Sequence, residues 1–283
     1  MSNKNYLSIY AKSFNWAGFF LPKKTYQKCS ALYDFCRTVD NIADDDGEID
    51  VKKKDLLVFK DDFINKNYNN EIIKNMWDLM DHHSISVKIV EDLFDGVDSD
   101  LNKKVQLNNK KDLLIYSYRV AGTVGLMMAK ILKVKDQNST KAAIDLGIAM
   151  QLTNIARDVV EDSNINRFYI KNDFEAICNT LALANLFYKS SFTAIKQMPF
   201  KFRFAILVAR RVYKKIGDKI LRTRNIVAYN KAGKIYVNSI EKIFQTIFSI
   251  FDLITLLLTK QKSSYMNNEH FLIREEINLD ERI

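Results

Sequence analysis

Apolar side chains recur every three to four residues along most of this chain. That interval places them on one face of an α-helix and leaves polar side chains on the other. Short polar breaks interrupt the pattern near residue 47 and over residues 102–109, 135–137 and 163–166. The periodicity predicts helices over residues 23–44, 54–66, 71–81, 84–101, 110–132, 137–162, 172–197, 201–222 and 234–260.

Turn-forming residues are scarce, with 8 Gly and 2 Pro among 283 residues. A sheet-rich fold of this length would need many more of them. Pro22 and Pro199 both stand at predicted helix starts, where a missing N–H is harmless. We therefore predict an all-α fold. Since no shift in composition marks a boundary, residues 1–283 are interpreted as one domain, with residues 263–283 as a polar tail.

The net charge is +9, from 43 Lys and Arg against 34 Asp and Glu. Such an excess favours an anionic partner. The basic residues are spread along the chain and no nucleic-acid-binding motif is present, so we expect no nucleic acid. A phosphorylated substrate and an anionic membrane surface stay open, beside the simpler interpretation of a solvated, lysine-rich surface.

Cysteine and histidine usage argues against disulfides and zinc. Cys29, Cys36 and Cys178 are too few, and odd in number, for a disulfide framework, which favours a reducing compartment. The three histidines have no zinc-ligand spacing. The first residues lack the apolar stretch of a signal peptide. We therefore expect a cytoplasmic protein.

The strongly apolar run over residues 243–258 allows two interpretations. It is shorter than the ~20 residues that a membrane-spanning helix needs. The favoured interpretation is a helix buried in the core. The alternative is a surface helix in peripheral contact with the inner face of the cell membrane, with Lys242, Lys260 and Lys262 beside it.

Two pairs of aspartates are the clearest chemical signal. Asp40 and Asp44 form one pair and Asp158 and Asp162 the other, each spaced by four residues within an apolar stretch. On a helix this spacing stacks two carboxylates on one face, where their charges repel unless a cation lies between them. Carboxylate oxygens suit Mg²⁺, or Mn²⁺, which binds one or two carboxylates together with substrate phosphate. The pattern predicts a divalent-metal and diphosphate site between two helices.

Three longer runs that contain these pairs resemble blocks of the squalene/phytoene synthase family. They read YDFCRTVDNIADD from Tyr33, YSYRVAGTVGLMMAKIL from Tyr116 and QLTNIARDVVED from Gln151, in the order that the family has them. Near the N-terminus, Lys12-Ser13-Phe14 followed by Leu21-Pro22 is similar to the family's first block. The resemblance covers about residues 10–240 and is greatest to bacterial phytoene synthases.

The resemblance implies the isoprenoid synthase helical bundle with a central apolar cavity. It implies a prenyltransferase that joins two geranylgeranyl diphosphates head to head into phytoene, via prephytoene diphosphate, without NADPH. Allylic prenyl diphosphates would be its substrates and carotenoid biosynthesis its pathway. The alternatives are a squalene or dehydrosqualene synthase that uses two farnesyl diphosphates, and a non-catalytic assembly factor on the same fold.

The resemblance also assigns roles to positions of this chain. The metal ligands would be Asp40, Asp44, Asp158 and Asp162, of which Asp40 and Asp158 are counted as catalytic together with Tyr33 and Tyr116. Tyr116 is our candidate for assisting proton loss. The substrate-binding residues would be Lys12, Ser13, Arg37, Gln151, Asn154, Arg157 and Arg224. Deletion of residues 263–283 is expected to leave catalysis largely intact.

Two further positions bear on this assignment. Gly122 and Gly125 lie three residues apart on a predicted helix and would allow close approach of a prenyl chain or of a neighbouring backbone. Asn41 stands where many phytoene synthases have a further aspartate. Because the pair formed by Asp40 and Asp44 is intact, we expect metal binding to persist.

Overall fold

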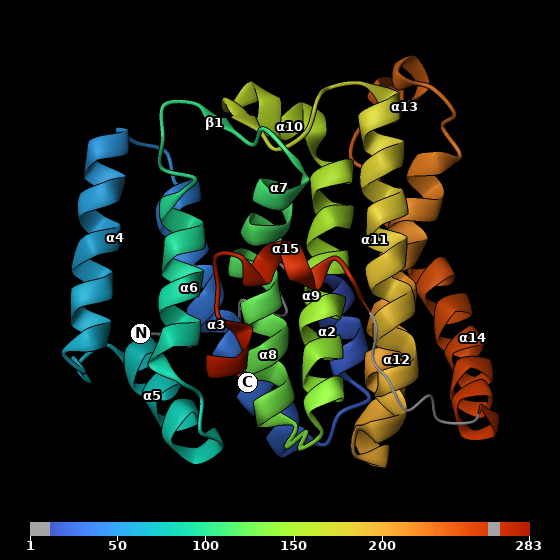
Figure 1. Cartoon of the computed structure of the whole chain (residues 1–283), viewed down its shortest axis with the longest axis horizontal. Coiled ribbons are helices and arrows are strands. Elements are labelled where there is room, and N and C mark those ends of the chain that lie inside the picture. Colours follow the sequence, from blue (N-terminus) through green and yellow to red (C-terminus); the bar gives the residue numbers. More distant parts are fainter. Residues whose placement is uncertain (1–11, 260–266) are drawn as a thin grey trace.

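The computed structural model describes residues 12–259 and 267–283, and within these ranges helices dominate (Figure 1). Two short strands, β1 (Val105–Gln106) and β2 (Arg167–Phe168), pair in parallel. The all-α prediction is therefore confirmed. The α-helices are α2 (Lys12–Gly18), α3 (Lys23–Asp44), α4 (Ile49–Ile64), α5 (Glu71–His83), α6 (Val87–Asp98), α7 (Lys110–Ser117), α8 (Thr123–Ile131), α9 (Gln137–Arg157), α10 (Val159–Asn164), α11 (Phe174–Ala194), α12 (Phe200–Leu221), α13 (Ile226–Ala232), α14 (Ser239–Leu258) and α15 (His270–Arg274).

Most helix boundaries follow the signals in the sequence. Pro22 and Pro199 directly precede α3 and α12, as predicted. Two predicted helices are interrupted. The helix predicted over residues 110–132 contains a π-helical turn, Tyr118–Gly122, between α7 and α8, and the helix predicted over residues 137–162 breaks at Asp158 between α9 and α10. Helices α2, α13 and α15 were not predicted.

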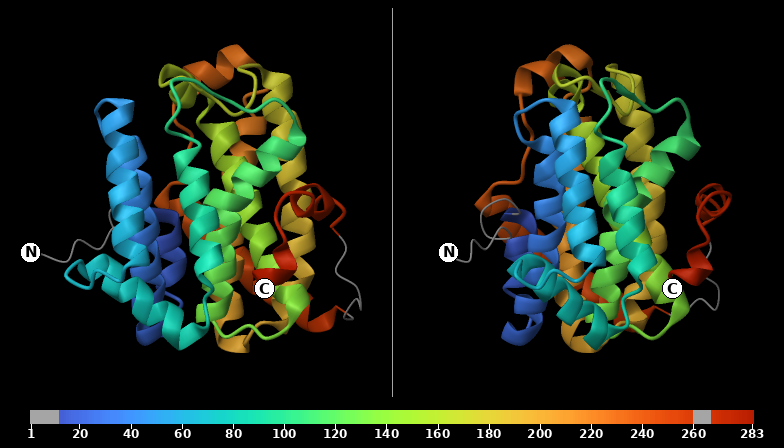
Figure 2. Two further views of the ribbon diagram at one scale, coloured as in Figure 1. Left: turned by 60° about the vertical axis from the view of Figure 1, so that its left-hand side comes forward. Right: turned by 90° about the vertical axis from the view of Figure 1, so that its left-hand side faces the viewer.

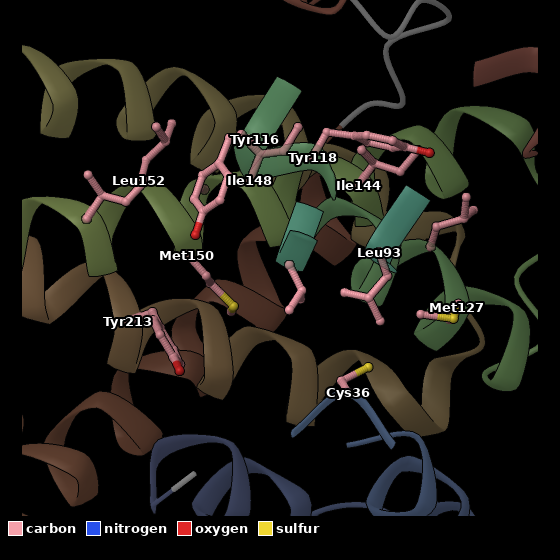
Figure 3. Close-up of a cluster of buried hydrophobic side chains, with 14 of the residues drawn as sticks. Cys36, Leu93, Tyr116, Tyr118, Met127, Ile144, Ile148, Met150, Leu152 and Tyr213 are labelled. Carbon is pink, nitrogen blue, oxygen red and sulfur yellow. The ribbon is translucent and has the colours of Figure 1, made fainter. Parts of the chain in front are cut away.

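Helix α9 runs through the middle of the bundle and packs against α8, α11 and α12. Its buried side chains include Ile144, Ile148 and Leu152, which meet Leu93 of α6 and other apolar side chains in one continuous core (Figure 3). The long helices run side by side, so their ends gather at the two ends of the bundle (Figures 1 and 2). This arrangement brings the C-terminal ends of α3 and α9 to the same end of the molecule as β1 and α10.

Glycines set the distance between α8 and α9. A Cβ atom built on Gly125 would lie 2.2 Å from the carbonyl oxygen of Ala143, and one on Gly147 would lie 2.2 Å from that of Ala121. No side chain fits at such distances. The close approach that Gly122 and Gly125 indicated is therefore made, in the case of Gly125, by a neighbouring backbone.

The C-terminal segment, residues 267–283, is packed against the bundle and is not a free tail. It lies across the outside of the bundle (Figure 2) and buries Ile273, Ile277 and Leu279. Arg282 donates two hydrogen bonds of 3.0 Å to the buried carboxylate of Asp92 on α6. The interpretation of this segment as a polar tail is wrong for residues 267–283, because their apolar side chains and a buried ion pair hold them to the core. That its deletion leaves catalysis largely intact stays a prediction.

Helix α14 contradicts the prediction of a buried helix over residues 243–258. Apart from Leu253 and Leu256, its apolar side chains are exposed, whereas Lys242 and Ser249 on the opposite side are buried. The favoured interpretation was wrong because an apolar run indicates that the segment avoids water, but it does not indicate whether the protein core or another apolar surface covers it. In the part of the chain described, no helix is long and apolar enough to span a bilayer.

The close backbone contact at Gly147 predicts that one added methyl group has a large effect on stability. Gly147→Ala should lower the free energy of unfolding by about 1–3 kcal/mol, because the backbone must separate to admit the Cβ atom. Gly217→Ala is the control: its Cβ would meet only the Leu181 side chain, at 3.1 Å, and alanine favours a helix. Urea denaturation of both variants measures the difference; equal stability of the two would contradict this contact.

The C-terminal segment yields a second prediction. Arg282→Met should lower the free energy of unfolding by about 3 kcal/mol, because it leaves the Asp92 carboxylate buried without its cation. The control is Arg274→Met, which removes an exposed ion pair to Asp280 and should change the stability by less than about 1 kcal/mol. Urea denaturation separates the two cases, and a loss of similar size in both variants would show that the segment is held by other contacts.

Candidate active site

The first acidic pair lies in the last turns of α3. Asp44 is exposed, and its carboxylate accepts hydrogen bonds from Arg167 Nη1 at 2.9 Å and from Arg37 Nη1 at 3.5 Å. Asp40 lies one turn deeper and is half-buried. Burial, followed by repulsion from Asp44, raises the pKa of Asp40 from 3.8 to about 7. A bound cation would therefore stabilise the ionised form of Asp40.

The second pair lies where α9 ends. Asp158 occupies the break between α9 and α10, with φ −105° and ψ 15°. Its carboxylate accepts a hydrogen bond of 2.7 Å from Arg157 Nε and lies 3.4 Å from Lys234 Nζ. One turn further, burial and then repulsion from Asp158 raise the pKa of Asp162 to about 7. Each pair thus combines one carboxylate that is hydrogen-bonded to arginine with one that is short of positive charge.

Asp100 and Arg167 connect the two pairs. The negative charge of Asp100 raises the pKa of both Asp40 and Asp162, and the guanidinium of Arg167 lowers both. Arg167 belongs to β2, which follows α10, and its partner β1 follows the chain segment that contains Asp100. The two acidic pairs therefore border one polar space at the end of the bundle. A packed core between them would have contradicted the predicted site.

Asp100 and Arg167 were not foreseen from the sequence. Asp100 lies at the end of a predicted helix in a run of charged residues, which resembles an ordinary solvated turn. Arg167 comes five residues after Asp162, beside the predicted loop over residues 163–166. Only the pairing of β1 with β2 brings Arg167 back over α3. In the sequence, the one available signal for Arg167 was that it is a basic residue soon after the second acidic motif.

Tyr116 lies beneath this space and not in the cavity wall. Its hydroxyl donates a hydrogen bond of 2.8 Å to Asp100, and the hydroxyl of Tyr169 donates another of 2.7 Å to the same carboxylate. The two tyrosine rings stack with centroids 4.6 Å apart. Burial and the neighbouring Asp100 hold the pKa of Tyr116 well above its usual range. Tyr116 therefore stays protonated and holds Asp100 in place.

An apolar cavity of about 260 Å³ extends from the acidic end into the bundle. A single water needs only about 10–15 Å³, so this space is far larger than a packing defect and can hold a ligand. Along α3 its wall runs from Tyr26 to Asp40, fourteen residues or about 20 Å of helix. The far end is lined by small or flexible side chains: Gly18, Leu21, Met128, Ala129, Leu132, Ala143, Met198 and Ala205.

The structure brings most of the predicted site residues together. Those that line the cavity are Tyr33, Arg37, Asp40, Gln151 and Asn154. Asp44, Arg157, Asp158 and Asp162 are not part of the lining; Asp44 follows Asp40 on α3, and Arg157 and Asp158 follow Asn154 at the end of α9.

The remaining predicted residues are less closely connected. Ser13 is half-buried on α2, next to Phe14, which lines the cavity. The side chain of Lys12 lies outside the described residues. Arg224 is exposed in the turn between α12 and α13 with a φ of 65°, and within the described ranges no contact connects it to the acidic pairs.

The donor set fits a divalent cation that is completed by its substrate. Among the described residues, no group of three or more His, Cys, Asp or Glu is close enough to hold a metal alone. Each acidic pair offers hard oxygen ligands, and Mg²⁺ commonly takes one or two carboxylates with water and phosphate oxygens. The buried Oδ1 atom of Asn154, on the cavity wall, has no hydrogen-bond partner in the described part of the chain. It could accept from a metal-bound water.

Known proteins are similar to this chain in sequence and in fold. A family model described as squalene/phytoene synthase matches residues 7–175, more than half of the chain. The 15-cis-phytoene synthase of Pantoea ananas is 28% identical over 247 residues, covering 76% of this chain and 80% of that protein. The phytoene synthase of Cereibacter sphaeroides is 30% identical over 243 residues, covering 74% and 68%.

Solved structures agree on the fold. A crystal structure of a dehydrosqualene synthase in complex with ligand superposes with a TM-score of 0.73 and 26% identity, covering 88% of this chain and 94% of that one. The squalene synthase HpnC from Alicyclobacillus acidocaldarius superposes with a TM-score of 0.67 at 16% identity, which shows the fold alone. Because the family model matches more than half of the chain, this chain belongs to the squalene/phytoene synthase family.

Proposed function

We propose that this protein is a phytoene synthase, which condenses two geranylgeranyl diphosphates head to head. The family to which it belongs consists of head-to-head prenyl condensation enzymes. The observation that carries the proposal is the deep apolar cavity with an acidic, arginine-flanked opening, found in a chain 27–35% identical to proteins named phytoene synthase. Mg²⁺ is the cofactor typical of the family.

The cations at the opening suit the binding of diphosphate. Arg37, Arg157 and Arg167 surround the acidic end, and a guanidinium binds phosphate oxygens through charge-assisted hydrogen bonds. Mg²⁺ held by Asp40 and Asp44 on one side, and by Asp158 and Asp162 on the other, would stabilise the negative charge of departing diphosphate. Loss of one diphosphate and one proton would give prephytoene diphosphate, and loss of the second diphosphate and another proton would give phytoene.

The cavity wall would protect the allylic cation. Apolar side chains line most of it and exclude water, which would otherwise trap the cation as an alcohol. Tyr33 faces the cavity one to two turns below Asp40, and burial raises the pKa of its hydroxyl above the usual range. The Tyr33 hydroxyl therefore stays protonated at neutral pH, so it can act as a hydrogen-bond donor but not as a tyrosinate base. Released diphosphate, held beside it, is the stronger proton acceptor.

Chain length separates the proposal from its alternative. The resemblance to a dehydrosqualene synthase structure favours the C15 substrate farnesyl diphosphate. Small side chains at the far end, among them Gly18 and Ala205, leave room for the additional isoprene unit of a C20 substrate. The non-catalytic alternative would be favoured by loss of an acidic pair, and this chain retains both.

Incubation of the purified protein with C15 or C20 diphosphate, Mg²⁺, and NADPH present or absent tests the proposal. We expect phytoene from the C20 substrate without NADPH and no product from Asp40→Asn. Ala205→Phe should fill the far end and reduce turnover of the C20 substrate at least tenfold more than turnover of the C15 substrate. Extraction and chromatography of the hydrocarbons provide the measurement. A C30 product from wild type, with the C20 substrate unused, would establish the alternative.

Because the pKa of Asp40 is raised, replacing this residue by Asn should increase the free energy of unfolding, by an amount that depends on pH. The wild type becomes less stable as pH rises from about 4 through 7, because ionised Asp40 is disfavoured in the folded state but not in the unfolded chain. Asp40→Asn avoids this loss. At pH 8 without divalent cations, the variant should be more stable by about 1–2 kcal/mol, allowing for partial solvent screening, and the gap should narrow towards pH 4.

Chemical denaturation at pH 4.5 and pH 8 measures this difference. Asp45→Asn, at an exposed neighbouring position, is the control and should leave the pH dependence unchanged. Addition of Mg²⁺ with inorganic diphosphate should stabilise the wild type more than Asp40→Asn. If Asp40→Asn were less stable than the wild type at pH 8, ionised Asp40 would not destabilise the folded protein, and the prediction would be wrong.

A further inference from the structure

Helix α14 is amphipathic with its polar side turned inward. Towards the bundle it presents Lys242, Thr246, Ser249 and Asp252, joined only near its end by Leu253 and Leu256. The outward side chains are apolar and between 45% and 80% exposed: Ile240, Ile243, Phe244, Ile247, Phe248, Ile250, Phe251, Ile254, Leu257 and Leu258. These ten residues are called the outer face of α14. An ordinary surface helix has the opposite orientation.

Specific polar contacts fix this orientation. Arg211 of α12 donates a hydrogen bond of 2.6 Å from Nη2 to Asp252, and Trp16 Nε1 of α2 donates one of 2.9 Å to Thr246. At the other end, Lys219 Nζ lies 2.8 Å from Glu241. Rotation of α14 to bury its apolar residues would break all three contacts. These contacts therefore keep the outer face exposed. It extends along about 30 Å of helix at the edge of the bundle (Figure 1).

The charge of the chain is concentrated in the same region. Residues 196–259 contain thirteen Lys and Arg against three Asp and Glu, whereas the other residues contain thirty against thirty-one. Two of those three acids, Glu241 and Asp252, are already ion-paired. Exposed basic side chains in this stretch include Lys201, Arg222, Arg224 and Lys231, whereas the exposed Lys234 is ion-paired with Asp158 and Glu161. Basic residues are spread over the chain, but acidic ones are almost absent here.

We propose that the outer face of α14 docks on an anionic lipid bilayer. An apolar helical face within a basic region binds at the interface of a membrane, where the side chains enter the acyl boundary and the cations meet acidic headgroups. A second copy of this chain is a poorer partner, because it would bring the same excess of positive charge to the contact.

The placement suits the chemistry proposed above, and this step rests on the proposed function. Helix α2 contacts α14 through Trp16 and lines the cavity with Phe14, Ala17 and Gly18. A bilayer against α14 would therefore lie one helix away from the apolar cavity. Prenyl substrates could arrive from it and a C40 hydrocarbon, which water does not dissolve, could leave into it. Lys242, expected to flank a membrane helix, is buried on the inner side; Lys260 and Lys262 lie outside the described residues.

Vesicle flotation without substrate tests the docking independently of catalysis. The full chain is mixed with vesicles of phosphatidylcholine, with or without phosphatidylglycerol. The test variant changes Phe244, Phe251 and Leu258 to Gln, at positions 55%, 59% and 80% exposed. The control changes Val51, Leu57 and Val58 of α4 to Gln, at positions 55%, 59% and 52% exposed, on the opposite edge of the bundle (Figure 1).

We expect wild type and control to float with phosphatidylglycerol vesicles and to be released by high salt. The test variant should need at least tenfold more lipid for half-maximal binding, and its thermal unfolding should match that of the wild type. Turnover of substrate in detergent should stay unchanged, while turnover of substrate embedded in vesicles should fall. Failure of the wild type to float, equal flotation of the test variant, or a dimer in sedimentation velocity that only the test variant dissociates would each overturn the proposal.

Discussion

Repulsion between carboxylates at one end of the bundle is the constraint on which the site depends. Asp40, Asp44, Asp158, Asp162 and Asp100 gather around one polar space, where burial and mutual repulsion raise the pKa of Asp40 and Asp162 to about 7. Replacing such charges by uncharged side chains would stabilise a purely structural fold. Under the proposed function, a ligand that brings both divalent cations and diphosphate would offset this repulsion, with Arg37, Arg157 and Arg167 binding the diphosphate.

The body of the bundle supports this end with an apolar interior and close contacts between helices. Gly125 of α8 packs on the backbone of α9 at Ala143, and Gly147 of α9 packs on the π-helical turn at Ala121, so the helix that carries Gln151 and Asn154 is held closely to its neighbours. The C-terminal segment holds the other side of the same helices through Arg282 and Asp92, whose carboxylate also accepts a hydrogen bond from Tyr118 in the π-helical turn. Under the proposed function this cavity would hold an allylic cation, and close helix packing around it would help to exclude the water that traps such a cation.

The outer surface follows a different principle. Helix α14 directs its polar residues inward and its apolar ones outward, and the salt bridge from Arg211 to Asp252 is one of three polar contacts that fix this orientation. An exposed apolar surface of this length is a liability in water and is retained where a partner covers it. The polar contacts beneath α14 show that its orientation is specified and is not a consequence of poor packing.

The sequence by itself determined the helical fold, the helix starts after Pro22 and Pro199, and the two acidic pairs as candidate metal ligands, because these depend on local spacing along the chain. The 3.6-residue period and the four-residue spacing of Asp40 and Asp44 are local properties that survive in any arrangement of helices. The tertiary structure alone decided which surfaces meet. It brought Arg167 and Asp100 to the acidic pairs through two short strands, placed Tyr116 behind Asp100, attached residues 267–283 to the core and turned α14 outward. Each of these depends on contacts between residues far apart in the chain, for which the periodicity of a single helix carries no information.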